Sequence, residues 1–173
     1  LSGCQMQRVA IARVLALEPE VLLLDEPFSH IDNFRKNSLR RKLFFYLKEQ
    51  QITCIVATHD STDVLAFADE VAIIKEGKIV ESGIPKFIYG NPKDKYVASL
   101  FGDVNEIKIN GELKFVYPHQ LKAVMNSDLK VEIVNSYFRG SHYLMEAKFE
   151  NQTLFFESDE LLENGEVVCL KIK

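Results

Sequence analysis

Residues 21–27 read VLLLDEP, and this stretch decides the fold of the first part of the chain. Four consecutive apolar residues bounded by acids are typical of a strand buried on both faces, as in a parallel sheet. Ligands of such sheets bind beyond the carboxyl ends of the strands, so we expect Asp25 and Glu26 to lie where a ligand sits. One carboxylate suits a hard cation such as Mg²⁺, and the other can orient and deprotonate a water molecule. The alternative is that both acids only cap the next turn.

A second strand is predicted over residues 52–58, ITCIVAT, and it ends in His59. Between the two strands, leucines spaced by four at 39, 43 and 47 predict a helix over residues 33–50. A strand, a helix and a second strand in this order favour a right-handed crossover with neighbouring parallel strands. We therefore expect His59 to approach Asp25 and Glu26, where its imidazole can donate a hydrogen bond to a phosphoryl oxygen or to the attacking water.

Five motifs occur in a fixed order along the first hundred residues: LSGCQ at 1–5, QRVAIAR at 7–13, LLLDEP at 22–27, SHID at 29–32 and THD at 58–60. Together they resemble the ATP-binding subunit of ABC transporters, over residues 1–101. The resemblance implies a P-loop ATPase that works as a head-to-tail dimer, with two ATP molecules held between the subunits. It also implies roles for three of the residues above: Asp25 organises Mg²⁺, Glu26 is the general base, and His59 is the switch histidine.

The remaining implied site residues lie in two loops. Ser2, Gly3 and Gln5 correspond to the signature loop, which touches the γ-phosphate held by the opposite subunit, and Asp32 lies in the loop that couples the two sites. Ser2 is also a good N-cap, so the following helix would turn its free N–H groups toward a phosphate. Cys4 belongs to the same ATP-binding loop, but it stands where the family has glycine and adds a side chain at a point of close approach.

The sequence contains no Gly-x-x-x-x-Gly-Lys-Ser/Thr loop to hold the β- and γ-phosphates and no glutamine loop. We interpret it as a C-terminal fragment, and we expect these 173 residues alone to bind ATP weakly and to turn over little or none.

The rest of the first domain is predicted to hold a hairpin around Glu76-Gly77 and short helices at 85–89 and 95–101, with the domain boundary at Gly102. From residue 103 the pattern changes to short strands, at 104–109, 112–116, 130–137, 142–150, 153–157 and 166–172. The pair Asn110-Gly111 predicts a hairpin turn between the first two of them. We expect an α/β nucleotide-binding part over 1–102, with a partial P-loop NTPase parallel sheet, followed by a small all-β, OB-like barrel over 103–173. Residues 116–121, 140–141 and 165–168 resemble the TOBE-like regulatory domain of importers for polyamines, ferric iron, sulfate or sugars.

Charge argues against a nucleic-acid partner. Residues 103–173 hold 8 basic and 12 acidic side chains, whereas residues 1–102 hold 13 of each, so the acidic excess lies on the barrel. Most barrel aromatics, at 137, 138, 143, 149, 155 and 156, are interpreted as core instead of a base-stacking surface. The basic residues 35, 36 and 40–42 are predicted to lie on the exposed side of the long helix.

The three cysteines are widely spaced and form no C-x-x-C pair, so neither a disulfide framework nor a zinc site is indicated. No apolar run reaches the length of a membrane span. By the resemblance, the protein would be cytoplasmic and held at the inner face of the membrane by permease subunits, as a homodimer, with a solute-binding protein in the complex. Two alternatives to an importer ATPase remain: a soluble ABC ATPase of translation or repair, and a non-catalytic regulatory binding module.

Overall fold

The computed structural model describes residues 3–29, 31–109 and 111–173, and it divides into two compact units, Leu1–Val71 and Ala72–Lys173. Each unit is described by itself. Ser2 lies outside the described residues, and so does the Asn110 position of the predicted 110–111 turn.

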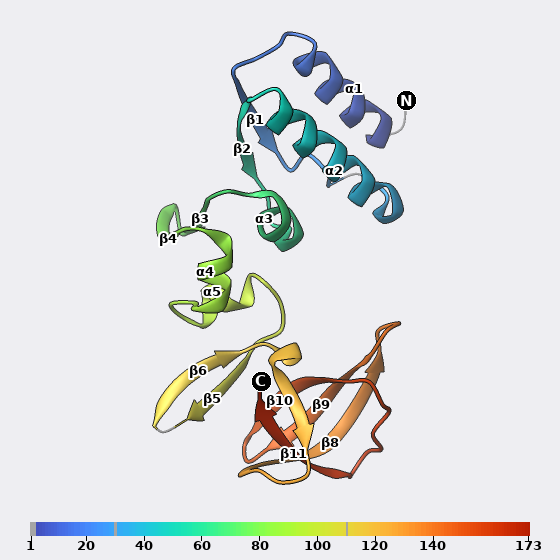
Figure 1. Cartoon of the computed structure of the whole chain (residues 1–173), viewed down its shortest axis with the longest axis vertical. Helices are drawn as coiled ribbons and strands as arrows, with labels where there is room; N and C mark the ends of the chain where they lie inside the picture. Colours follow the sequence, from blue (N-terminus) through green and yellow to red (C-terminus); the bar gives the residue numbers. More distant parts are fainter. Residues whose placement is uncertain (1–2, 30, 110) are drawn as a thin grey trace. The chain divides into compact units, whose positions relative to one another are not determined.

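The first unit alternates helices and strands in the predicted order (Figure 1). Its strands β1 and β2 pair in parallel, in the register Val21↔Thr53 to Asp25↔Ala57, which confirms the strand, helix, strand arrangement. The elements are α1 (Gly3–Leu15), β1 (Val21–Asp25), α2 (Asn33–Glu49), β2 (Thr53–Ala57) and α3 (Ser61–Phe67).

The core of this unit lies between β1 and the two longer helices. Leu22 of β1 packs with Leu43 and Leu47 of α2, and Ile11 and Leu15 of α1 lie against the same cluster. The predicted four-residue leucine spacing of α2 therefore does face the core, because residues four apart lie on one side of a helix.

The expectation that the 21–24 strand is buried on both faces is wrong for this unit. Leu23 is 72% exposed and pairs in register with Ile55, which is 63% exposed, while Val21 is exposed beside them. The physical reason is that both helices pack on the face that carries Leu22, and successive side chains of a strand point to opposite faces. An apolar run alone predicts a strand but not how many of its faces are covered.

The prediction that the basic residues of α2 lie on its exposed side is wrong for two of them. Arg40 is only 4% exposed, because it turns toward α3 and pairs there with two carboxylates. The Lys36 side chain, 19% exposed, pairs with one of the same carboxylates. Arg35, Arg41 and Lys42 are exposed as expected.

The second unit begins with the hairpin of β3 (Val71–Lys75, which starts at the last residue of the first unit) and β4 (Lys78–Gly83). Glu76 and Gly77 both have positive φ, at 51° and 73°, as the predicted two-residue turn requires. Two short helices follow, α4 (Pro85–Gly90) and α5 (Lys95–Ser99), close to their predicted ranges.

All later strands pair antiparallel. β5 (Asn105–Ile109) and β6 (Glu112–Val116) form a hairpin, and the 3₁₀ helix η1 (Pro118–Gln120) leads into a five-stranded sheet ordered β10-β9-β8-β11-β7, drawn in orange to red in Figure 1. Its strands are β7 (Leu121–Val124), β8 (Leu129–Phe138), β9 (Tyr143–Phe149), β10 (Gln152–Ser158) and β11 (Val167–Ile172). The all-β character is confirmed, whereas β7 and η1 had not been predicted.

The expected closed barrel is not found in the strand pairing of the described residues, since β10 and β7 end the hydrogen-bonded order. One face of the sheet nevertheless carries a buried apolar core of Leu121, Val131, Ile133, Met145, Leu154, Phe156 and Leu170. Of the barrel aromatics, Phe156 is fully buried and Tyr143 and Phe149 pack against this core, but Tyr137 and Phe138 at the end of β8 are exposed.

Asn105 and Tyr117 connect the other elements of this unit to one another. The Asn105 side chain, 2% exposed, donates to the Phe155 carbonyl and accepts from the Phe155 N–H, both at 2.7 Å. The Tyr117 ring lies parallel to that of Tyr89 at 4.4 Å between centroids, and its hydroxyl donates to the Ala98 carbonyl at 3.2 Å.

Candidate functional site

The candidate site lies where β1 and β2 end. Because the two strands are parallel and Asp25 pairs with Ala57, their carboxyl ends meet at one edge of the sheet. Asp25 is the last residue of β1, and Glu26 follows it with its N–H donated to the Ala57 carbonyl at 2.9 Å. Thr58 and His59 leave the neighbouring strand at the same level.

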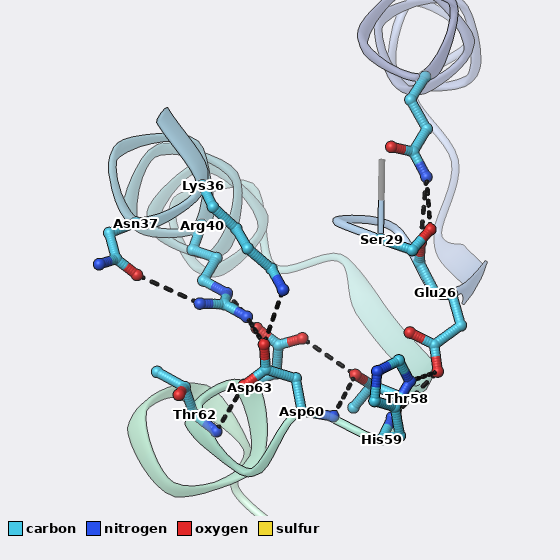
Figure 2. A network of polar contacts seen from close by, with 11 residues as sticks. Glu26, Ser29, Lys36, Asn37, Arg40, Thr58, His59, Asp60, Thr62 and Asp63 are labelled. Carbon is cyan, nitrogen blue, oxygen red and sulfur yellow. Dashed lines mark hydrogen bonds and ion pairs between the residues drawn. The ribbon is translucent and has the colours of Figure 1, made fainter. Parts of the chain in front are cut away.

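Glu26 and His59 are in direct contact. One carboxylate oxygen of Glu26, Oε1, accepts the backbone N–H of His59 at 3.0 Å and lies 2.6 Å from the ring nitrogen Nδ1 (Figure 2). The imidazole is 81% exposed, whereas the Glu26 side chain is 35% exposed. An imidazole held through Nδ1 leaves Nε2 for a further hydrogen bond, and the second Glu26 oxygen can serve a water molecule.

The backbone of Glu26 is held in an unusual conformation. Its φ is 45°, in the left-handed region that non-glycine residues adopt rarely. The Gln7 amide Nε2 donates to the Glu26 carbonyl at 3.1 Å, and the Ser29 hydroxyl donates to the same carbonyl at 3.0 Å. A strained backbone conformation persists where surrounding contacts hold it in place, and residues with such a conformation cluster at functional sites.

Asp25 presents a carboxylate that is exposed, and no described residue engages it. The described residues contain no group of three or more His, Cys, Asp or Glu side chains arranged to hold a metal ion by themselves. A single exposed carboxylate could serve as one ligand of Mg²⁺, which takes one or two carboxylates and completes its shell with water and substrate phosphates.

The described residues of the predicted signature loop lie at the start of the first helix. Gly3 is the first residue of α1 and Gln5 lies in its first turn, while the Ser2 position and the side chain of Cys4 lie outside what the structure describes. Asp32 occupies the N-cap position of α2, with an exposed side chain that makes no capping hydrogen bond. The structure thus brings Glu26 and His59 together and places Asp32 at the beginning of the helix that connects their strands.

A network of charges behind His59 had not been predicted. Arg40 of α2 pairs with Asp60 through Nη2 and with Asp63 through Nε, and Lys36 Nζ lies 2.8 Å from Asp60 (Figure 2). Asp60 also caps α3 by accepting the Thr62 N–H at 3.0 Å. Partial burial by itself would raise the pKa of Asp60, but the hydrogen bonds from Lys36, Arg40 and Thr62 outweigh it and hold that pKa well below its ordinary value.

One sequence signal could have located this network. Lys36 and Arg40 are four residues apart and so share a face of α2, and acids follow His59 at positions 60 and 63. The basic pair on the crossover helix and the acidic pair at the start of the next helix carry opposite charges and can therefore form ion pairs.

Comparison with known proteins finds a family that the start of this chain resembles. The ABC transporter family model matches residues 1–29. The spermidine/putrescine import ATP-binding protein PotA of Mesomycoplasma hyopneumoniae is 32% identical over 201 aligned positions, which cover 99% of this chain and 44% of that protein. The glucose import ATP-binding protein GlcV of Saccharolobus solfataricus is 44% identical over 108 residues, which cover 62% of this chain and 31% of that protein.

Among solved structures, cbiO1 of Clostridium perfringens, part of the ABC transporter complex cbiONQ, matches with 42% identity and a TM-score of 0.47, over 52% of this chain and 36% of that one. The sequence matches confirm the resemblance: the chain is similar to the ABC transporter family over residues 1–29 and to the ATP-binding proteins of importers over longer stretches. It spans less than half the length of the curated relatives described above. Within the described residues, no helix combines the length and the apolar character of a membrane span.

Proposed function

We propose that this chain is part of the ATP-hydrolysing, energy-coupling subunit of an ABC importer. The observation that carries the proposal is the Glu26–His59 contact at the shared edge of two parallel strands, within a sequence similar to importer ATP-binding proteins. A carboxylate held beside an imidazole at such an edge is suited to activate water next to a bound phosphate.

In this proposal ATP is the substrate, and Mg²⁺, held by Asp25, supplies neutralisation of the phosphate charge when bound. Glu26 accepts the proton of the attacking water through the carboxylate oxygen that His59 does not occupy. His59 keeps the Glu26 carboxylate in place through its backbone N–H and Nδ1. With a proton on both ring nitrogens, the exposed Nε2 donates to a phosphoryl oxygen.

The signature segment acts toward a second subunit. Ser2, Gly3, Cys4 and Gln5 would contact the γ-phosphate of an ATP bound to the partner, because the start of a helix presents free N–H groups to an anion. Asp32, exposed at the start of α2, would couple the two sites of a homodimer.

The remaining features of the proposal concern assembly. Residues 1–102 would be the C-terminal part of the nucleotide-binding domain and residues 103–173 a TOBE-like regulatory domain. The subunit would lie on the cytoplasmic side of the membrane, bound to permease subunits that work with a solute-binding protein and with no nucleic acid. The acidic excess on residues 103–173 supports the last point.

The test is the substitution Glu26→Gln in the protein at its natural length, with ATP hydrolysis as the readout. Loss of the base should lower turnover by a factor on the order of 10²–10⁴ while ATP binding persists. Glu20→Gln, an exposed acid just before the same strand, is the matched control and should keep full turnover. Unchanged turnover in E26Q would reject Glu26 as the base.

The 173-residue chain by itself is expected to bind ATP weakly and to hydrolyse little or none, since no described residue supplies a phosphate-cradling lysine loop. Calorimetric titration with Mg²⁺ and ATP measures this directly. Tight binding by the isolated chain would instead favour a site built from these residues alone, and thus a nucleotide-regulated binding module.

A further inference from the structure

We propose that Arg40 is a positioning residue that, together with Lys36, fixes the backbone on either side of His59 and so holds His59 against Glu26. The effect of Arg40 on ATP hydrolysis rests on the function proposed above, but the position of His59 can be measured without nucleotide.

The Arg40 guanidinium is built into the interior of the first unit. It is 4% exposed, its carbon lies 5.5 Å from the centre of the Phe28 ring, and Nη1 donates to the Asn37 side chain at 3.2 Å. Nη2 donates to Asp60 and Nε forms an ion pair with Asp63, so one planar group from α2 joins two carboxylates at the start of α3 (Figure 2). A fork of fixed donors is the geometry that arginine provides and lysine does not.

The network reaches both neighbours of His59. Asp63 accepts the Thr58 hydroxyl at 3.1 Å, and the same Thr58 oxygen accepts the Asp60 N–H at 3.0 Å. Residues 58 and 60 are therefore both tied to the carboxylates that Arg40 holds. The residue between them has its N–H directed at Glu26 Oε1.

His59 depends on this arrangement because packing does little to restrain it. Its side chain is 81% exposed, and the contacts that the structure gives it are both to one oxygen of Glu26. Its position is thus set by its backbone, and its backbone by the Asp60 and Asp63 carboxylates.

Removing the guanidinium would leave Asp60 and Asp63 close together with one half-buried lysine as their nearest cation. Uncompensated buried carboxylates repel each other and regain water or protons, so the segment 58–63 would shift. Since α2 begins at Asn33, directly after Asp32, Arg40 also connects the helix that starts at the Asp32 loop to the segment carrying His59.

The experiment is nuclear magnetic resonance of the 173-residue chain at one fixed pH, comparing Arg40→Met with Arg41→Met. Arg41 is the adjacent, exposed arginine of the same helix and serves as the matched control. In R40M, hydrogen exchange at the His59 amide should accelerate at least tenfold and the His59 ring nitrogen signals should move toward those of a free imidazole. In R41M both readouts should stay as in the unsubstituted chain. R40K should retain only part of the His59 amide protection, with ring nitrogen signals between those of the unsubstituted chain and of R40M.

Amide protection at Leu22 and Ile55, whose N–H groups face the partner strand, reports whether the variant still folds. If R40M does not fold, Thr58→Val is measured in its place, because it removes the hydroxyl link and keeps the side-chain volume and the Arg40 ion pairs. Unchanged His59 exchange and ring signals in a folded R40M or T58V chain would overturn the proposal. Nucleotide is absent from this measurement, so an E26Q protein with normal ATP hydrolysis would reject the proposed function and leave the positioning result standing.

Discussion

Asn105 offers the sharpest test of how the second unit is held together. Its amide meets the backbone of Phe155, on the strand β10 that ends the hydrogen-bonded order of the sheet. Edge strands leave backbone N–H and C=O groups without ladder partners, and here one side-chain amide serves both groups of a single residue. Asn105→Ala removes both hydrogen bonds and leaves two half-buried backbone groups without these partners.

The expected loss follows from these two contacts. Each buried backbone group left without a hydrogen-bond partner costs about 1–3 kcal/mol of stability. Because some water would reach the half-buried Phe155, we expect N105A to lose a total of about 2–4 kcal/mol. For a unit of this size, 1 kcal/mol lowers the melting temperature by about 4–8 °C, so N105A should lower it by about 10 °C or more.

The assay combines thermal unfolding with hydrogen exchange at the Phe155 amide, which should lose its protection in N105A. Asn126→Ala, at an exposed bend, is the control and should change neither. Asn105→Asp sharpens the test, because an ionised carboxylate at this buried position would face the Phe155 carbonyl. N105D should be less stable than N105A at neutral pH and should recover relative to it in acid, where the protonated carboxyl can donate. An N105A protein with unchanged melting temperature and Phe155 protection would refute the reasoning.

Three further outcomes are expected. The pKa of Asp60 is lowered on folding, so its contribution to stability is complete above about pH 4 and is lost as the pH falls toward the pKa of the folded state. The variant Asp60→Asn should therefore show a weaker dependence of the stability of the first unit on pH below about pH 4, measured by unfolding at a series of pH values. Burial, and secondarily Tyr89, raises the pKa of Tyr117, so its contribution persists up to about pH 10 and is lost as the pH rises further; an ultraviolet absorbance titration should show a late tyrosine step that Tyr117→Phe removes. Phe156→Ala, at the centre of the β-sheet core, should cost about 3–5 kcal/mol in denaturant unfolding, whereas the exposed Phe87→Ala should stay within about 0.5 kcal/mol.

The parts of the fold that follow from short-range patterns could be predicted from the sequence. Leucines spaced by four placed α2 on the core, and an Asn-Gly pair between alternating residues placed the β5–β6 hairpin. The convergence of Glu26 and His59 followed from parallel pairing alone, because residues after neighbouring parallel strands meet at one edge.

The parts that the sequence did not predict depend on partners far along the chain. Arg40 looked like one more exposed cation until folding brought Asp60 and Asp63 beside it. Asn105 has no local pattern, since its contact lies fifty residues away. Leu23 shows the opposite limit, because hydrophobicity reports what a face prefers and not what covers it.

The left-handed backbone at Glu26 restricts which amino acids can replace it during evolution. Asparagine and aspartate accept this conformation more readily than glutamate, and glycine most readily of all, so backbone relaxation favours exchange toward shorter side chains. Aspartate would keep the charge but withdraw the carboxylate by one methylene from the His59 N–H. At position 26, relief of backbone strain thus favours a shorter side chain, whereas the contact with the His59 N–H requires the length of glutamate. A glutamate at this position indicates that the contact outweighs the strain.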